Sequence, residues 1–95
     1  MRQPLTLEQA KALVQAELGT SELVILDEAT IERDFGWVFF YQNRSYLETR
    51  NILKILAGNA PYIVNRHTRE LQVTGTGRPI EEYIARYERY GDTHV

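Results

Sequence analysis

The sequence predicts an α+β domain in which a small antiparallel sheet of about four strands packs against an N-terminal and a C-terminal helix. Three observations predict this class. Helical periodicity marks both ends of the chain, alternating apolar and polar residues mark the segments between them, and short turns join those segments as hairpins. With 95 residues and an ordinary globular composition, the chain is expected to form one domain over residues 1–95.

The first helix is expected over residues 6–18. Thr6 and Gln9 form a capping box, because the Thr6 hydroxyl can accept from the Gln9 amide while the Gln9 side chain reaches back to Thr6. Apolar residues then recur every three or four positions, at Leu7, Ala10, Val14 and Leu18. Gly19 is typical of the left-handed residue that ends a helix.

Two strands are expected next, paired as a hairpin. Residues 22–33 predict one long strand with a bulge near positions 27–28. Residues 37–41 predict a central strand, because both of its faces carry apolar bulk. The hairpin would place Trp37 and Phe39 opposite aliphatic residues of the first strand. Trp37 is therefore interpreted as a buried sheet tryptophan, with an exposed binding anchor as the alternative.

Residues 43–60 are the part of the chain whose structure the sequence leaves open, since residues 42–45 break the alternating pattern and residues 52–56 fit either a short helix or a strand. A turn precedes Pro61, which can only lead a strand because it cannot donate to a ladder. A second hairpin is expected from residues 62–65 and 70–74, with a polar tip at residues 66–69.

The last helix is expected directly after a glycine-containing turn at residues 75–78. Pro79 suits the first helical turn, because its missing N–H donor costs nothing there. An apolar stripe follows at helical spacing, with Ile80, Tyr83, Ile84 and Tyr87. Gly91 is expected to end this helix.

Charge and composition exclude several classes of function. A net charge of −2 argues against a nucleic-acid or anionic-membrane surface, since both need clustered Lys and Arg. Without cysteines the chain has no disulfides, thiol nucleophiles or Cys-containing zinc sites, and we expect neither a cofactor nor a metal. The sequence shows no signal peptide and no membrane-spanning stretch, so a cytoplasmic protein is expected.

Residues suited to catalysis are few. His67 lies at the expected hairpin tip and His94 at an expected frayed terminus, so neither would be held as a general base must be. Glu28 and Glu32 share a strand face and are interpreted as a solvated surface that could steer a basic partner. The turn at residues 75–78 is interpreted as a strand-to-helix connection, with anion binding as the alternative. We therefore expect a binding protein and not an enzyme.

Four segments resemble the immunity protein 35 family, which includes YrhB-type proteins, in their order and spacing. These segments are GWVFFY (36–41), LET (47–49), GNAPYIV (58–64) and TGTGRPIEEY (74–83). One position departs from the family pattern, since Arg69 stands where a glycine is expected in the hairpin turn. The resemblance implies a small cytoplasmic antitoxin that is made beside a polymorphic toxin and binds the toxin's catalytic domain. A papain-like peptidase is one candidate for that domain.

Such an inhibitor needs an interface of about 800 Å² per partner with a few aromatic or arginine anchors. The residues that we expect to contact the toxin are Glu28, Glu32, Tyr46, Glu48, Arg50 and Asn59. Glu48 and Asn59 could instead tie down a loop through hydrogen bonds. Two other functions stay open, a chaperone-like holding function suggested by the YrhB-type resemblance and an enzyme acting on a small anion at residues 75–78. The oligomeric state also stays open.

Overall fold

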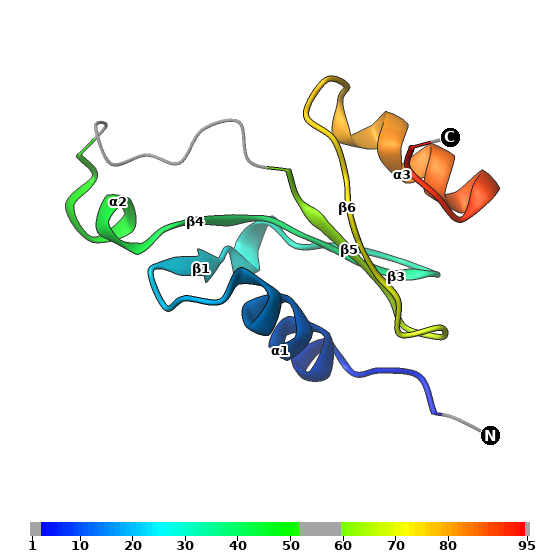
Figure 1. Ribbon diagram of the computed structural model, residues 1–95, viewed down its shortest axis with the longest axis horizontal. Coiled ribbons are helices and arrows are strands. Elements are labelled where there is room, and N and C mark those ends of the chain that lie inside the picture. Colours follow the sequence, from blue (N-terminus) through cyan, green and yellow to red (C-terminus); the bar gives the residue numbers. More distant parts are fainter. Residues whose placement is uncertain (1–2, 52–59, 95) are drawn as a thin grey trace.

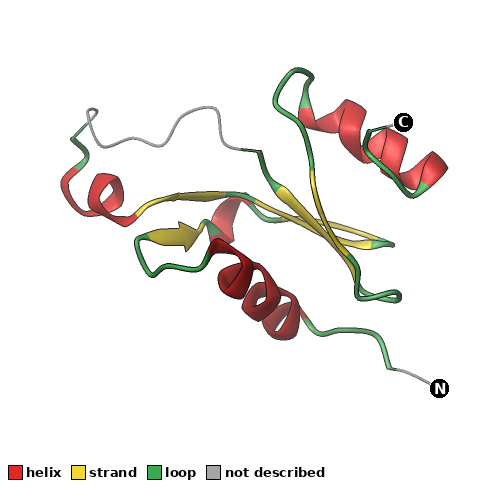
Figure 2. Ribbon diagram, in the orientation of Figure 1, coloured by secondary structure: helices red, strands yellow, loops and turns green. Residues whose placement is uncertain are grey.

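A four-stranded antiparallel sheet lies at the centre of the molecule in the computed structural model, which describes residues 3–51 and 60–94 (Figure 1). Its strands follow the order β2 (Ile31–Arg33), β3 (Gly36–Phe39), β5 (Tyr62–Asn65) and β6 (Leu71–Val73). A two-stranded antiparallel sheet pairs β1 (Leu23–Ile25) with β4 (Tyr41–Asn43). The helices of the described residues are α1 (Leu7–Leu18), α2 (Arg44–Thr49), α3 (Ile80–Tyr90) and a 3-10 helix, η1 (Asp27–Ala29) (Figure 2). The predicted α+β class is confirmed.

The helices α1 and α3 cover opposite faces of the four-stranded sheet (Figure 1). On one face, α1 packs through Ala10 and Val14 against Trp37, Phe39 and Val64. On the other face a second cluster joins the sheet to α3, and its buried members are Val38, Ile63, Ile84 and Tyr87. Each of these side chains is at most 5% exposed, so β3 and β5 are buried on both faces. The predicted central strand is therefore confirmed.

The first helix begins and ends as its sequence predicts. Thr6 and Gln9 form the capping box with N···O distances of 3.0 and 3.2 Å, and Gly19 ends the helix with a φ of 73°. The apolar stripe differs at its start, because Leu5 before the cap is buried whereas Leu7 is 42% exposed. Leu5 thus takes the position of a hydrophobic staple at the entry to the helix.

The C-terminal helix also follows its sequence pattern. Tyr83, Ile84 and Tyr87 are buried, and Gly91 ends the helix with a φ of 72°. A Cβ added at Gly75 would lie 2.4 Å from the Tyr83 hydroxyl oxygen. The glycine therefore allows the helix to pack closely against the segment that leaves β6.

Strands β1 to β4 form one long hairpin that is interrupted by a bulge. Ile25 pairs with Tyr41 and Ile31 pairs with Val38, so the first strand advances six residues while its partner advances three. The surplus residues form η1, at the positions where a bulge was expected, and their backbone bonds locally instead of joining the ladder. The bulge divides the predicted long strand into β1 and β2, which belong to different sheets.

Trp37 is buried as predicted, but its cross-strand partner is not aliphatic. Continued without the bulge, the register of β1 and β4 would have placed Trp37 opposite Ala29, whereas the observed partner is Glu32. An arginine lies over the indole instead, with the Arg66 guanidinium carbon 4.6 Å from the ring centroid. The Glu32 carboxylate holds Arg66 in place at 3.0 Å.

The C-terminal segment is docked on β6, so the expectation of a frayed terminus at His94 is wrong. The backbone N–H and the hydroxyl of buried Thr93 donate to the Gln72 side-chain oxygen at 2.7 and 2.8 Å. His94 Nε2 lies 2.9 Å from the Val73 carbonyl oxygen. These contacts cover the outer edge of the sheet.

Candidate functional site

The end of the molecule that carries α2 presents three of the residues expected to contact a partner. Tyr46, Glu48 and Arg50 lie on α2 and at its C-terminal cap. Glu48 and Arg50 are exposed, and the Arg50 guanidinium carbon lies 5.6 Å from the ring centroid of partly buried Tyr46. The fold thus places an aromatic, an acidic and a basic side chain within one short, exposed stretch of chain.

Hydrogen bonds from neighbouring residues hold α2 against the β1–β4 pair. The Asn43 side-chain oxygen caps the helix by accepting from the Ser45 N–H at 3.0 Å. Arg44 donates from Nε to the Ser21 carbonyl oxygen at 2.8 Å, which ties the helix to the turn before β1. A six-residue helix would not be stable alone, so these contacts give α2 its position.

The other expected contact residues do not join this group. Glu28 is exposed in η1, whereas Glu32 binds Arg66 in the β5–β6 turn, toward the opposite end of the long axis from α2 (Figure 1). Asn59 lies outside the described residues. Because Arg66 offsets the charge of Glu32 locally, Glu32 adds less to long-range steering than Glu28 does.

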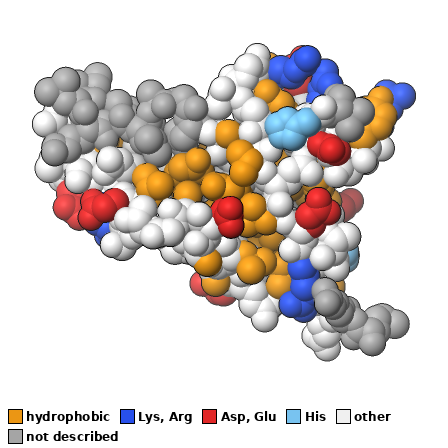
Figure 3. Space-filling view, viewed as in Figure 1, with side chains coloured by type: hydrophobic (Ala, Val, Ile, Leu, Met, Phe, Trp, Pro, Cys, Tyr) orange, Lys and Arg blue, Asp and Glu red, His pale blue; other side chains and the backbone are white. Residues whose placement is uncertain are grey.

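A second surface lies beside α1, where this helix leaves part of the sheet uncovered. It consists of Leu13 and Glu17 of α1, Tyr41 of β4, Tyr62 of β5, and Leu71 and Val73 of β6, and we call it the tyrosine face. Leu13 and Val73 are each 40% exposed. Figure 3 shows hydrophobic side chains gathered over this part of the molecule, where α1, β4, β5 and β6 lie in Figure 1.

Tyr41 and Tyr62 form the centre of the tyrosine face. Their ring centroids are 5.6 Å apart, and the Tyr41 hydroxyl donates to the Ala60 carbonyl oxygen at 3.0 Å. Partial burial raises the pKa of the Tyr62 phenol above its ordinary value of 10.0, and the neighbouring Tyr41 and the Glu17 carboxylate raise it further. Tyr62 is therefore a neutral phenol at physiological pH.

The turn at residues 75–78, where anion binding was the alternative, carries one positively charged side chain, Arg78. A shallow depression there is lined by Phe40, Pro61, Gly75, Thr76, Arg78, Ile80 and Tyr83. The Arg78 guanidinium lies 3.8 Å from the Glu82 carboxylate, which offsets the positive charge that an anion would need. The depression therefore supports the anion-binding alternative only through its shape.

The described part of the chain contains neither a group of side chains suited to bind a metal ion nor a helix suited to span a membrane. Within residues 3–51 and 60–94, no three His, Cys, Asp or Glu side chains form a group that could hold a metal ion. None of the helices in these ranges has the length and apolar composition needed to cross a bilayer.

The tyrosine face could not be predicted from the sequence, because its residues come from four separate elements. Tyr41 and Tyr62 meet only when β4 and β5 take their places in the fold. One local signal exists, since Leu13 is a large apolar residue that lies off the predicted stripe of its helix. An apolar residue in that position is typical of a contact surface when others gather beside it.

Comparison with known proteins adds a likeness in sequence. A family model described as "Immunity protein 35" matches residues 7–86. The "Uncharacterized protein YrhB" of Escherichia coli (strain K12) is 43% identical over 53 residues, which is 56% of this chain and 56% of that protein. The match thus spans about half the length of this curated relative. No solved structure matches the chain.

Proposed function

The chain belongs to the immunity protein 35 family, and on this ground we propose that it is an immunity protein that binds a toxin domain and neutralises it. The family match carries the proposal, since it runs from the start of α1 into α3 and so includes the whole sheet. The exposed apolar side chains beside α1, and the partly buried Tyr46 with Arg50 at the α2 end, support a binding role.

The contact surface in this proposal begins at the α2 end. Tyr46 and Arg50 are of the residue types that dominate binding energy at protein interfaces, and the exposed Glu48 lies between them in sequence. Glu28 and Glu32 would contribute electrostatic attraction, and Asn59 belongs to the same proposed surface. Because β4 leads directly into α2, this surface is continuous along the chain with Tyr41 of the tyrosine face.

The proposed mechanism is occlusion of the toxin's active cleft. A papain-like peptidase is the toxin class that we propose, in line with the family resemblance. Such an enzyme needs an open cleft for its peptide substrate, so a rigid protein of this size can inhibit it by covering the entrance. The antitoxin needs no catalytic residue of its own for this task.

The test uses the toxin domain encoded beside this chain's gene. The wild-type chain should bind that domain in a one-to-one complex, restore growth of cells that express it, and abolish its peptidase activity at equal concentration. Tyr46→Ala and Glu48→Arg should each weaken binding about tenfold or more, measured by titration calorimetry. Glu88→Arg is the matched control, since Glu88 is an exposed acid in the last turn of α3.

Each outcome bears on a different part of the proposal. A toxin that neither binds nor is inhibited would overturn the immunity function. Binding that is unchanged by both Tyr46→Ala and Glu48→Arg would remove α2 from the contact surface. A toxin domain that the chain binds and neutralises in cells, but that shows no peptidase activity when it is free, would leave the immunity function in place and reject the papain-like class.

A holding function is a second candidate, because several large apolar side chains are exposed. Leu7, Leu13 and Val73 are each at least 40% exposed, and Tyr90 is 52% exposed. A chaperone-like protein would suppress the thermal aggregation of unrelated proteins at comparable ratios, whereas an antitoxin would bind one partner tightly and leave the others to aggregate. An aggregation assay with several unrelated client proteins separates the two functions.

A further inference from the structure

On the α1 side of the four-stranded sheet, the exposure of the side chains rises with distance from β3. Phe39, Tyr62 and Val73 lie side by side on this face, since Phe39 pairs with Tyr62 and Tyr62 pairs with Val73. Phe39 is buried, Tyr62 is partly buried and Val73 is 40% exposed. The packing of α1 thus leaves an apolar strip of Tyr62, Leu71 and Val73 in contact with solvent.

One flank of α1 borders this apolar strip. The opposite flank is held against β1 and η1, because Lys11 forms an ion pair with Asp27 at 2.7 Å and Gln15 donates to the Leu23 carbonyl oxygen at 3.0 Å. With 3.6 residues per turn, Leu13 projects from the side of the helix away from Lys11 and Gln15. Since α1 contacts β1, β3 and β5, the flank away from β1 faces β5, and Leu13 extends the strip there.

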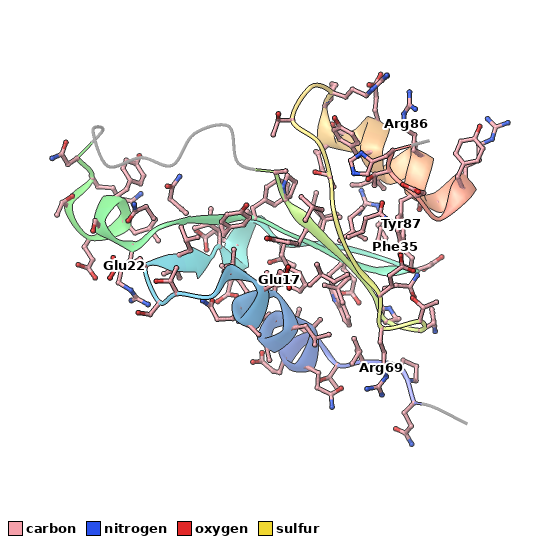
Figure 4. All side chains as sticks on the ribbon, in the orientation of Figure 1. Glu17, Glu22, Phe35, Arg69, Arg86 and Tyr87 are labelled. Atoms are coloured by element: carbon pink, nitrogen blue, oxygen red, sulfur yellow. The ribbon has the colours of Figure 1, made fainter. Side chains whose placement is uncertain are left out.

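A charged residue lies at each end of α1 beside the strip. Glu17 lies in the last turn, on the same flank as Leu13 and four residues after it. Arg69 lies at the other end, because its guanidinium donates to the carbonyl oxygen of Gln3, just before the helix begins, at 3.1 Å. Figure 4 shows Glu17 and Arg69 toward opposite ends of α1. A separation of about ten residues along the helix corresponds to about 15 Å.

Neither of these charges is neutralised by an ion pair in the described part of the chain. Glu17 and Arg69 are both exposed, and neither takes part in an ion pair within residues 3–51 and 60–94. The bond to Gln3 uses a single N–H of the Arg69 guanidinium and leaves its positive charge in place. The strip therefore has an unpaired acid at one end and an unpaired base at the other.

This arrangement is self-complementary about a two-fold axis. In a two-fold symmetric dimer the same patch of each copy meets the other, so a residue that contacts a second residue is contacted by it in turn. With the axis through the apolar strip, the two α1 helices run antiparallel, and the acidic end of each meets the basic end of the other. The apolar side chains then meet at the axis, and two ion pairs form at the rim.

We propose that the chain forms a two-fold symmetric dimer through this face. Leu13, Leu71 and Val73 form the centre of the interface, and Glu17 of each copy pairs with Arg69 of the other. The opposite charges at the two ends favour a second copy over an unrelated partner, because the chain itself carries the complementary pattern. Dimerisation does not depend on the proposed function, since the residues of α2 proposed to contact a toxin lie outside the paired ones.

The test measures the mass of the purified chain in solution by sedimentation equilibrium, at concentrations from about 1 μM to about 1 mM. The wild type should change from the mass of one chain to twice that mass as its concentration rises. Glu17→Arg and Arg69→Glu should each raise the dissociation constant about tenfold or more, because each brings like charges together twice in the dimer. Both substitutions in one chain should return the constant to within about threefold of the wild type, since the exchange restores opposite charges.

Two further variants complete the test. Glu88→Arg is the matched control, because Glu88 is an exposed acid in the last turn of α3, as Glu17 is in α1. It should change the dissociation constant less than about twofold. Leu13→Asp should leave the chain monomeric, since it places two charges in the apolar centre. Glu17 and Leu13 are exposed, so these variants should stay folded, which thermal unfolding verifies for each.

Several results would overturn the dimer. A wild-type chain that stays monomeric at the highest concentration would do so, as would a dimer that both charge reversals leave intact. A folded double variant that does not regain the dimer would reject the pairing of Glu17 with Arg69. A monomeric chain whose affinity for the toxin domain encoded beside its gene falls in Leu13→Asp would place the toxin on this face instead.

Discussion

Arg69 ends the β5–β6 turn in a conformation that suits glycine. Its φ is 67°, and its backbone N–H donates to the Asn65 carbonyl oxygen at 3.0 Å. The Asn65 side-chain oxygen accepts from the N–H groups of His67 and Thr68 at 2.8 and 3.0 Å, which fixes the turn. The family pattern led us to expect a glycine here, and the left-handed backbone gives the physical reason.

Replacing Arg69 therefore tests how much the left-handed backbone at this position lowers the free energy of unfolding. Arg69→Gly and Arg69→Ala both remove the bond from the guanidinium to the Gln3 carbonyl oxygen at 3.1 Å, but only glycine relieves the strained φ. We expect the glycine variant to have a free energy of unfolding about 1 kcal/mol higher than the alanine variant. Urea unfolding measures the difference, and equal stabilities would show that the turn carries no strain.

Single residues were predictable where a local pattern decides their place. The burial of Trp37 follows from its strand, and the capping box at Thr6 and Gln9 follows from four consecutive residues. The arginine over Trp37 did not follow, because Arg66 is 29 positions away and reaches the indole only through the β3–β5 pairing. Contacts of this kind depend on the register of strands, which a single sequence does not specify.

At the scale of elements, the bulge marks the limit of the sequence pattern. Its position near residues 27–28 could be predicted, because acidic residues interrupt an apolar strand there. Its size could not, since alternation with a period of two does not reveal how many residues leave the ladder. The three surplus residues shift the register of β2 and change the partner of Trp37 from Ala29 to Glu32. Residues 44–49 belong to the stretch that the sequence left open, and they form a helix capped by Asn43, whereas residues 52–56, which fit either a helix or a strand, lie outside the described residues.

The docking of the C-terminal segment on β6 can be tested through one side chain. Gln72→Ala removes the acceptor for both donors of buried Thr93, so it should lower the free energy of unfolding by about 1–3 kcal/mol. Gln72→Glu retains an acceptor oxygen and should therefore lower the free energy of unfolding by less than Gln72→Ala does. Amide hydrogen exchange at Thr93 should accelerate in the alanine variant and stay slower in the glutamate variant. Equal exchange in both variants would contradict the role given to Gln72.

At the scale of the whole molecule, the sequence predicted two helices on a sheet but not their placement on opposite faces. Periodicity identifies the buried stripe of each helix, and alternation identifies the two faces of each strand. Neither states which stripe meets which face, because that depends on the paths of the connecting segments. The tyrosine face follows from this arrangement, since the packing of α1 on its side of the sheet leaves Tyr62 partly exposed and Val73 exposed.

Tyrosines with raised pKa values should also make the free energy of unfolding depend on pH in the alkaline range. Burial raises the pKa of Tyr87 above its ordinary value of 10.0, and Glu70 raises it further, while the hydrogen bond from Asn65 at 3.2 Å lowers it. The pKa of Tyr62 is raised as well. Above pH 10 the unfolded chain loses these phenol protons while the folded chain retains them. The contribution of these two phenols to the free energy of unfolding should therefore be constant below about pH 9. It should be lost as the pH rises through their pKa values in the folded chain.

Tyr87→Phe isolates the contribution of the tyrosine on the α3 side of the core, where Tyr87 is buried and packs against Phe35 with ring centroids 4.8 Å apart. The variant should lose about 1 kcal/mol at pH 7 with its hydrogen bond to Asn65, and its stability should fall less steeply than that of the wild type above pH 10. Tyr90→Phe is the control, since Tyr90 is 52% exposed, and it should keep the wild-type slope. Urea unfolding at pH 7, 9 and 10.5 measures the three slopes. A wild-type slope in Tyr87→Phe would show that this phenol ionises equally well in the folded and unfolded chains, and that the α3 side of the core does not exclude the charge.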